Sequence, residues 1–247
     1  MNIVVPMAGG DALFRQHGFP FPKPVVEIAG RPLVEHAFDC LSPIPDARFI
    51  FVIRKDDDLR FHLREMLQLM APNCVVLRAD GETAGAACTV LLAVEYIDND
   101  EELVIANADQ ILDVDLEAAI DSFRARGLDA ASLVFDSVHP RWSFVKTDAQ
   151  GLVVEAAEKR PISRNATAGF YYFRSGKFFV EAAQNLIRKD ASENGGYFVC
   201  PAFNEMILHQ QRVGVIGIER DRYISLATPR AVEEYEQALI ARRRAAQ

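Results

Sequence analysis

The sequence predicts an α/β protein with a Rossmann-like three-layer α/β/α arrangement on a mostly parallel mixed sheet. Two observations predict this fold class. Over the first 140 residues, short apolar runs bounded by turn residues alternate with longer segments of helical periodicity. After Trp142, strand-like runs follow one another with only turns between them, which is typical of antiparallel hairpins. We therefore expect hairpin additions on a parallel sheet.

The elements of the first part follow in order. Apolar, β-branched runs predict strands at 3–6, 49–53, 75–77, 103–107 and 131–135. Between them, apolar residues recur on one helical face and predict helices at about 32–41, 57–70, 84–96 and 116–126. Asp115 stands where the last of these helices needs its N-cap.

The second part is expected to begin with strands at 142–147 and 152–156, joined by a turn at 148–151. A strand at 167–173, a helix at 176–188 and a final helix at about 230–245 complete the chain. The three arginines near its end are expected to be a solvated helix terminus. The sequence contains no linker or repeat, so we expect one domain over 1–247.

Composition excludes several classes of protein. The 27 Lys and Arg against 35 Asp and Glu give a net charge of −8, without the basic stripe of a nucleic-acid binder. No apolar stretch approaches a membrane span, and Met1 leads directly into a strand-like run, so we expect a cytoplasmic protein. The four cysteines form no C-x-x-C pair and are expected to be buried, inert thiols.

Small residues follow the first predicted strand. Ala8, Gly9 and Gly10 would let backbone N–H groups approach a phosphate at the carboxyl edge of the sheet. Lys23 lies between two prolines that stiffen its loop, which suits a phosphate contact, although a solvated surface lysine is also compatible with the pattern. Neither the dinucleotide fingerprint nor the P-loop motif is present.

Two further segments follow strands. In 80–87, Gly85 would admit a flat base against the backbone near Asp80 and Glu82, or would only allow close packing at a helix start. Asn107 and Asp109 end an apolar strand, where a carboxylate would meet hard cations and phosphates.

Two acidic motifs have competing interpretations. Asp113 and Asp115 read either as the D-x-D of a metal-dependent glycosyltransferase or as a helix cap, and we favour the cap. Glu158 would accept hydrogen bonds from sugar hydroxyls while Lys159 holds a phosphate, or the two would form an exposed ion pair.

Read together and in order, these motifs resemble the nucleotidyltransferases that make nucleotide sugars, of the glucose-1-phosphate thymidylyltransferase type. A capsular-polysaccharide subgroup is similar also at 139–143 and 201–205. The resemblance covers nearly the whole chain. It rests on Gly9, Pro22-Lys23, Gly81 to Ala87, Asn107-x-Asp109, Glu158-Lys159, Ala168-Gly169 and Thr228-Pro229.

The resemblance implies that residues 1–140 bind the nucleotide and that 141–247 bind a sugar phosphate. Ala8, Gly9 and Gly10 would then hold the triphosphate, Lys23 its α-phosphate, and Asp109 a Mg²⁺ ion. The expected partners are a nucleoside triphosphate and a small phosphorylated substrate, with a homo-oligomer left open. The base would lie near Asp80, Glu82 and Gly85, and the sugar phosphate near Asn107, Glu158, Lys159 and Gly169.

The first loop departs from the family pattern G-x-G-x-R. Asp11 replaces its second glycine and Leu13 its arginine, and loss of an arginine that stabilises phosphoryl charge can cost ~10³–10⁵ in rate. Arg15 would substitute for it if the loop is extended, because residues two apart then share a face. The alternatives to an active nucleotidyltransferase are a catalytically impaired relative that binds a nucleotide or a partner and, through Asp113 and Asp115, a glycosyltransferase of similar fold.

Overall fold

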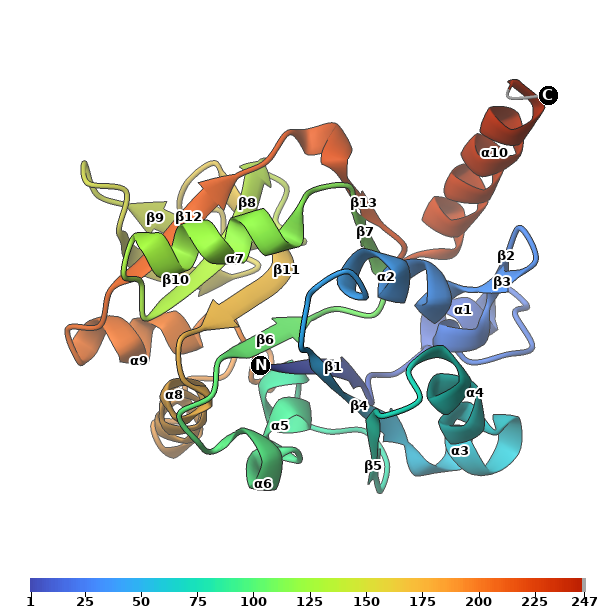
Figure 1. Ribbon diagram of the computed structural model, residues 1–247, viewed down its shortest axis with the longest axis horizontal. Helices are drawn as coiled ribbons and strands as arrows, with labels where there is room; N and C mark the ends of the chain where they lie inside the picture. Colours follow the sequence, from blue (N-terminus) through green and yellow to red (C-terminus); the bar gives the residue numbers. More distant parts are fainter. Residues whose placement is uncertain (246–247) are drawn as a thin grey trace.

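A nine-stranded mixed sheet forms the centre of the computed structural model, which describes residues 1–245 (Figure 1). Its parallel part runs in the order β6-β1-β4-β5, and the predicted strands at 3–6, 49–53, 75–77 and 103–107 are confirmed. Helices cover both faces of these mostly buried strands. The bounds are β1 (Asn2–Met7), β4 (Arg48–Arg54), β5 (Val75–Ala79) and β6 (Leu103–Ala106).

Antiparallel strands extend this sheet, as expected. The long strand β11 (Asn165–Phe173) pairs with β8 (Ala130–Asp136) at both its start and its end. It also pairs with β6 at its end and with β9 (Ser143–Thr147) at its start. The hairpin of β9 and β10 (Val153–Glu158) lies at the sheet edge. Of the strands in this nine-stranded sheet, β12 (Val213–Gly217) was not predicted, and it runs parallel to β8.

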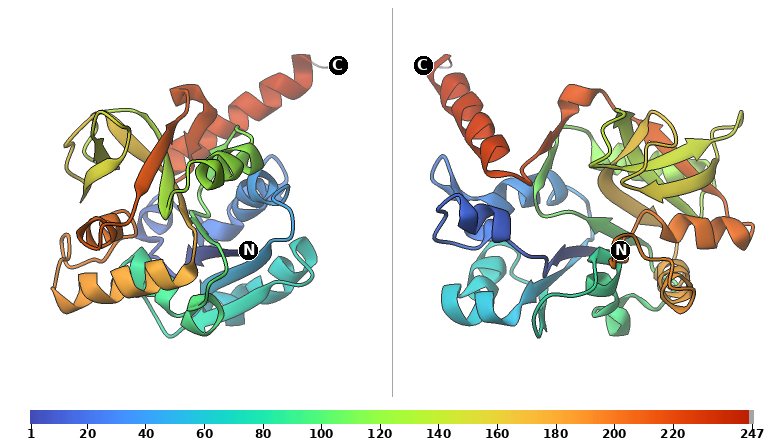
Figure 2. Two further views of the ribbon diagram at one scale, coloured as in Figure 1. Left: turned by 60° about the vertical axis from the view of Figure 1, so that its left-hand side comes forward. Right: turned by 180° about the vertical axis from the view of Figure 1, so that it is seen from behind.

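Helices on both faces complete three layers, and the predicted fold class is confirmed (Figure 2). One apolar cluster lies between the sheet and α2 (Leu33–Leu41), α4 (Leu63–Met70) and α7 (Leu116–Ala125). The opposite cluster is covered by α5 (Ala86–Leu91), α6 (Val94–Ile97), α8 (Gly176–Arg188) and α9 (Ala202–Leu208). Helix α8 has the predicted bounds.

Three of the sequence-based predictions for helices and loops are wrong in detail. The helix expected at 57–70 is two helices, α3 (Lys55–Phe61) and α4, because His62 between them has a left-handed backbone with φ 54°. The helix expected at 84–96 is likewise divided into α5 and α6. Residues expected as a loop after β1 form α1 (Ala12–Gln16).

Several short elements lie outside the nine-stranded sheet. A 3-10 turn covers Lys23–Val25, and the strand pairs are β2 (Glu27–Ile28) with β3 (Arg31–Pro32) and β7 (Gln110–Leu112) with β13 (Tyr223–Ser225). A second 3-10 turn covers Arg220–Arg222. The last helix, α10 (Pro229–Ala245), projects at the end of the molecule opposite the β9–β10 hairpin (Figures 1 and 2).

The predictions on membrane and cysteine chemistry have simple outcomes. In residues 1–245, no helix combines the length and the apolar character needed to span a bilayer. All four thiols are free, and burial raises the pKa of each. Only Cys200 is fully buried, whereas Cys40, Cys74 and Cys88 are half-buried.

Candidate functional site

A cavity of about 380 Å³ opens at the carboxyl ends of β1, β4 and β6, and both parts of the chain contribute to its wall. This edge is where open α/β sheets bind ligands. Six of the residues singled out from the sequence line the cavity, although they come from five separate segments. They are Gly9, Lys23, Asn107, Asp109, Glu158 and Gly169.

An ion pair joins two of these residues in the cavity wall. Lys23 Nζ donates to Asp109 Oδ2 at 2.8 Å. Lys23 begins the 3-10 turn that follows Pro22, whose φ of −64° is the value that the proline ring imposes. The backbone of Asp109 is fixed as well, because its carbonyl accepts from the N–H of Leu226 at 2.7 Å. Both charges are therefore held by ordered backbone.

Gly169 is required by its surroundings. Its φ is +61°, and a Cβ atom there would lie 2.3 Å from Asn107 Nδ2 and 2.4 Å from Gln110 Oε1. Its carbonyl accepts from the N–H of Asn107 at 3.0 Å and from Gln110 Nε2 at 2.9 Å. These bonds attach the irregular part of β11 to the segment after β6, where the pairing register shifts.

Glu158 and Lys159, which are adjacent in sequence, have different positions. Ser143 lies opposite Glu158 in the β9–β10 hairpin and donates its hydroxyl to Glu158 Oε2. Burial raises the pKa of Glu158, and the bond from Ser143 offsets only part of that rise. Lys159 is exposed and places Nζ over the ring of Phe198 at 4.8 Å, so it borders the cavity without lining it.

The loop after β1 differs from its expected form. Because residues 12–16 are helical, Arg15 turns back onto Asp11, donating from Nε at 2.9 Å and from Nη2 at 2.6 Å. The extended loop that would bring Arg15 to the position of the missing arginine is absent, and 63% of its side chain is exposed. Asp11 lines the cavity, whereas Ala8 and Gly10 lie outside its wall.

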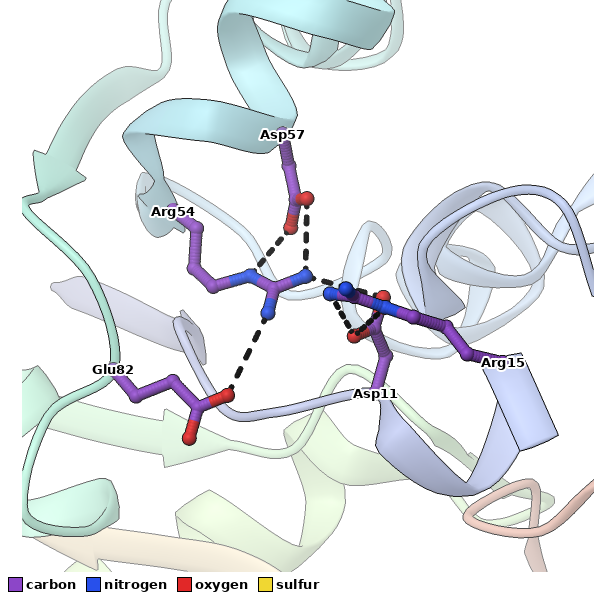
Figure 3. Close-up of polar contacts among 5 residues, drawn as sticks. All are labelled: Asp11, Arg15, Arg54, Asp57 and Glu82. Carbon is purple, nitrogen blue, oxygen red and sulfur yellow. Dashed lines mark hydrogen bonds and ion pairs between the residues drawn. The ribbon is translucent and has the colours of Figure 1, made fainter.

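Asp11 also contacts a second cation. Arg54 Nη2 lies 3.1 Å from Asp11 Oδ2 (Figure 3). Burial alone would raise the pKa of Asp11, but the bonds from Arg15 and the charge of Arg54 together hold it below its usual range. Asp11 is therefore an ionised carboxylate whose charge is balanced by two arginines, and it is not an uncompensated negative charge in the cavity.

The segment predicted to read the base lies beside the cavity, and only Ala86 lines it. Asp80 pairs with Lys55 at 2.9 Å on the surface. Gly85 has φ +103°, and a Cβ atom there would lie 2.3 Å from the carbonyl oxygen of Tyr197. The close approach of this distant segment explains why glycine is needed at position 85.

The D-x-D interpretation is not supported, and the capping interpretation is confirmed. Asp115 accepts from the N–H of Ala118 at 2.9 Å and caps α7. Asp113 pairs with Arg222 at 3.1 Å, and neither carboxylate lines the cavity.

Sequence reasoning missed several residues of the cavity wall. Arg54 ends β4, so the rule that led to Asn107 and Asp109 would have found it. Asp57 follows in the first turn of α3. The aromatic part of the wall gave no local signal, since it comes from two separate strands and two loop segments. It consists of Trp142, Tyr171, Phe198 and Tyr223.

The sequence of this chain matches a known protein family and several known proteins. The family model described as nucleotidyl transferase matches residues 19–215. A UTP–glucose-1-phosphate uridylyltransferase of Haloferax volcanii is 26% identical over 244 residues, covering 97% of this chain and 96% of that protein. A glucose-1-phosphate cytidylyltransferase of Salmonella typhi is 26% identical over 214 residues, covering 78% of this chain and 80% of that protein.

Solved structures agree with this result. A nucleoside-diphosphate-sugar pyrophosphorylase from Vibrio cholerae RC9 superposes with a TM-score of 0.83 at 25% identity, covering 95% of this chain and 99% of that one. A putative glucose-1-phosphate thymidylyltransferase from Bacillus anthracis, solved with sucrose, has a TM-score of 0.72 at 17% identity, covering 96% of this chain and 94% of that one. The second likeness shows the fold alone.

Proposed function

Because this chain belongs to the nucleotidyl transferase family, we propose that it transfers a nucleoside monophosphate from a nucleoside triphosphate to a sugar phosphate or similar small phosphate, releasing pyrophosphate. The family resemblance stated from the ordered motifs is confirmed by the match over residues 19–215. Uridylyl- and cytidylyltransferases among the similar proteins support the reaction class and leave the base open.

One observation carries the proposal. A lysine and a carboxylate, Lys23 and Asp109, lie 2.8 Å apart in the cavity that Glu158 and Gly169 also line. Phosphoryl transfer needs positioning and charge neutralisation more than covalent chemistry. A cation and an anion facing hydrogen-bonding groups across one cavity meet that need.

We assign the subsites as the family resemblance implies them, including residues that lie beside the cavity and not in its wall. The nucleotide subsite belongs to 1–140, and the acceptor subsite to 141–247 with Asn107. Lys23 would contact the α-phosphate, and Arg15 would act through Asp11. The nucleotide subsite comprises Ala8, Gly9, Gly10, Asp80, Glu82 and Gly85, and the acceptor subsite comprises Asn107, Glu158, Lys159 and Gly169.

Asp109 is the residue that we propose to hold Mg²⁺. The described residues contain no cluster of three or more side chains that hold a metal. Mg²⁺ nevertheless fits a single carboxylate, because it is commonly bound by one or two carboxylates together with substrate phosphates and water. When bound, the ion neutralises phosphate charge. Lys23 supplies a second positive charge at the same place.

The chemistry balances without a covalent intermediate. A phosphate oxygen of the acceptor forms a bond to the α-phosphorus, and the bond from that phosphorus to the bridging oxygen of the β-phosphate breaks. The electron pair leaves with pyrophosphate. Lys23 stabilises the charge that develops, while Glu158 and the backbone around Gly169 orient the acceptor.

The biological setting is the finer part of the proposal. Segments 139–143 and 201–205 resemble a capsular-polysaccharide subgroup, which supports a role in making precursors of surface polysaccharide. Nucleoside triphosphates are metabolites of the cytoplasm, so we place the reaction there.

The reaction class is tested by incubating the protein with magnesium, each of ATP, CTP, GTP, UTP and dTTP, and a panel of sugar 1-phosphates. Release of pyrophosphate from at least one pair is expected. The Asp109→Asn variant is the matched control and should release little or none. No release from any pair would contradict the proposal.

A second candidate is a catalytically impaired relative that binds a nucleotide or a partner, favoured by Leu13 at the position of the expected arginine. Replacing Asp11 by Gly and Leu13 by Arg together would then raise turnover from an undetectable level. Turnover by the unchanged protein would eliminate this candidate.

A further inference from the structure

Arg54 is an almost buried arginine at the edge of the candidate site. It is the last residue of β4, is 7% exposed, and lines the cavity together with Gly9 and Asp11. Strands β1 and β4 pair in parallel, with Met7 opposite Ile53, so Arg54 begins beside the loop that leaves β1. A buried guanidinium is costly unless its charge is compensated.

Two carboxylates compensate that charge and fix the guanidinium plane. Asp57 accepts from Nε at 2.7 Å and from Nη2 at 3.0 Å, which is a bidentate pair within one turn of chain. Asp11 lies 3.1 Å from Nη2 on the other side. With Arg15 on Asp11, two cations face two carboxylates, so the group as a whole is neutral (Figure 3).

One nitrogen of Arg54 is left over. Within residues 1–245, Nη1 makes no hydrogen bond, and its nearest ion-pair partner is Glu82 Oε1 at 3.8 Å, which is too long for one. Nη1 is therefore a donor of fixed direction that the fold does not use.

Glu82 shows where an anion is attracted. Its side chain is 66% exposed and has no hydrogen bond among the described residues. A Cβ atom on Gly10 would lie 2.7 Å from Glu82 Oε1, so the carboxylate sits between the first loop and Arg54. An exposed glutamate can move away from this position without breaking a buried contact.

We propose that Arg54 binds the phosphates that leave as pyrophosphate, through Nη1, and that Glu82 occupies the place of those phosphates until substrate displaces it. The inference deepens the proposed function and rests on it. Charge accumulates on the departing pyrophosphate when the bond to the α-phosphorus breaks, and a preorganised guanidinium stabilises that charge. Asp11 and Asp57 are positioning residues, because they act through Arg54.

Binding of inorganic pyrophosphate, measured by calorimetry in magnesium buffer, tests Arg54 without knowledge of the base or the sugar. Arg54→Lys keeps the positive charge but loses the planar guanidinium with its several N–H donors, so we expect pyrophosphate binding about 10- to 100-fold weaker. Arg78→Lys is the matched control. Arg78 lies on the neighbouring strand β5, outside the cavity, and pairs with the buried Asp58 of α3. It should bind like the unchanged protein.

Glu82→Gln gives a result that a purely structural arginine would not. Removing the competing carboxylate should strengthen pyrophosphate binding about 3- to 10-fold, and the exposed position protects the fold. Unchanged binding in Arg54→Lys, or weaker binding in Glu82→Gln, would overturn the inference.

The outcome also separates this inference from the proposed function. If the protein binds pyrophosphate through Arg54 but releases none from any substrate pair, the inference stands and the reaction does not. If it turns over and Arg54→Lys raises neither the KM for the triphosphate nor the pyrophosphate dissociation constant, the reaction stands and the inference fails. The KM for the sugar phosphate should be unchanged in Arg54→Lys.

Discussion

Lys23 and Asp109 form an ion pair at 2.8 Å between the turn after the first loop and the segment after β6. In the proposed reaction these same two groups bind a phosphate and a metal ion. Binding of the phosphate to Lys23 and of the metal ion to Asp109 must therefore break this ion pair. The pair keeps the two side chains ordered until the ligands bind. Two predictions follow, one for the loss of Lys23 and one for the loss of Asp109.

Lys23→Met should lower the rate of pyrophosphate release about 10²–10³-fold, because the charge on the α-phosphate loses its nearest cation. The measurement is initial rate with saturating substrates. Lys177→Met is the matched control, since Lys177 also pairs with an aspartate, Asp100, at 3.0 Å outside the cavity. Equal rates in the two variants would remove Lys23 from the mechanism.

Asp109→Asn should have a split effect. Turnover with magnesium should be lost, whereas binding of pyrophosphate without magnesium should tighten roughly fivefold, because the cavity loses a negative charge. Calorimetry in a chelating buffer measures the second quantity. Asp100→Asn should change neither, and weaker metal-free binding in Asp109→Asn would contradict the argument.

Gly169→Ala should destabilise the protein by about 2–4 kcal/mol. The new Cβ would overlap the side chains of Asn107 and Gln110, and the backbone has a positive φ. Urea unfolding measures the loss. Gly217→Ala is the control, because a Cβ atom there meets nothing within 4 Å and no positive φ is involved. Similar stabilities of the two variants would show that β11 relaxes around the methyl group.

The raised pKa of Glu158 makes stability depend on pH in a defined direction. The folded protein holds this proton more tightly than the unfolded chain, so the unfolding free energy falls as pH rises from the ordinary glutamate pKa, ~4.3, to the raised value. Above that window the cost is constant. Glu158→Gln removes it.

The corresponding measurement is the difference in Tm between Glu158→Gln and the unchanged protein. Glu158→Gln should be the more stable at neutral pH, and its advantage should vanish as the pH falls below the window. An advantage that grows on acidification would show that the carboxylate is stabilised by the fold. Glu155→Gln, on the same strand but half-exposed and paired with Arg160 at 3.1 Å, is the control.

The parts of the fold that were predicted correctly are those specified by neighbouring residues. Helix α8 and the strands of the parallel sheet have long periodic or apolar segments, and their positions follow from these. The break at His62 has no glycine or proline to mark it. The β7–β13 pair joins segments about a hundred residues apart, so no local pattern indicates it.

The residues of the candidate site also divide into those that a local pattern predicts and those that it does not. Lys23, Asn107 and Asp109 follow strands or sit in a stiffened loop, and strand-end reasoning places them together. Arg54 also ends a strand, so the same reasoning places it at this edge, but its contact with Asp11, far away in the sequence, is known only from the structure. The need for glycine at position 85 likewise depends on Tyr197.

Strand β11 reaches both proposed subsites, because its end pairs with β6 and its start pairs with β9. No hinge is needed to bring donor and acceptor together, since one run of backbone spans both. The β9–β10 hairpin hangs on the outer side of this strand. Under the proposed function, replacing that hairpin would change the acceptor subsite and leave the nucleotide subsite in place, so a new acceptor would need changes at the sheet edge and not at its centre.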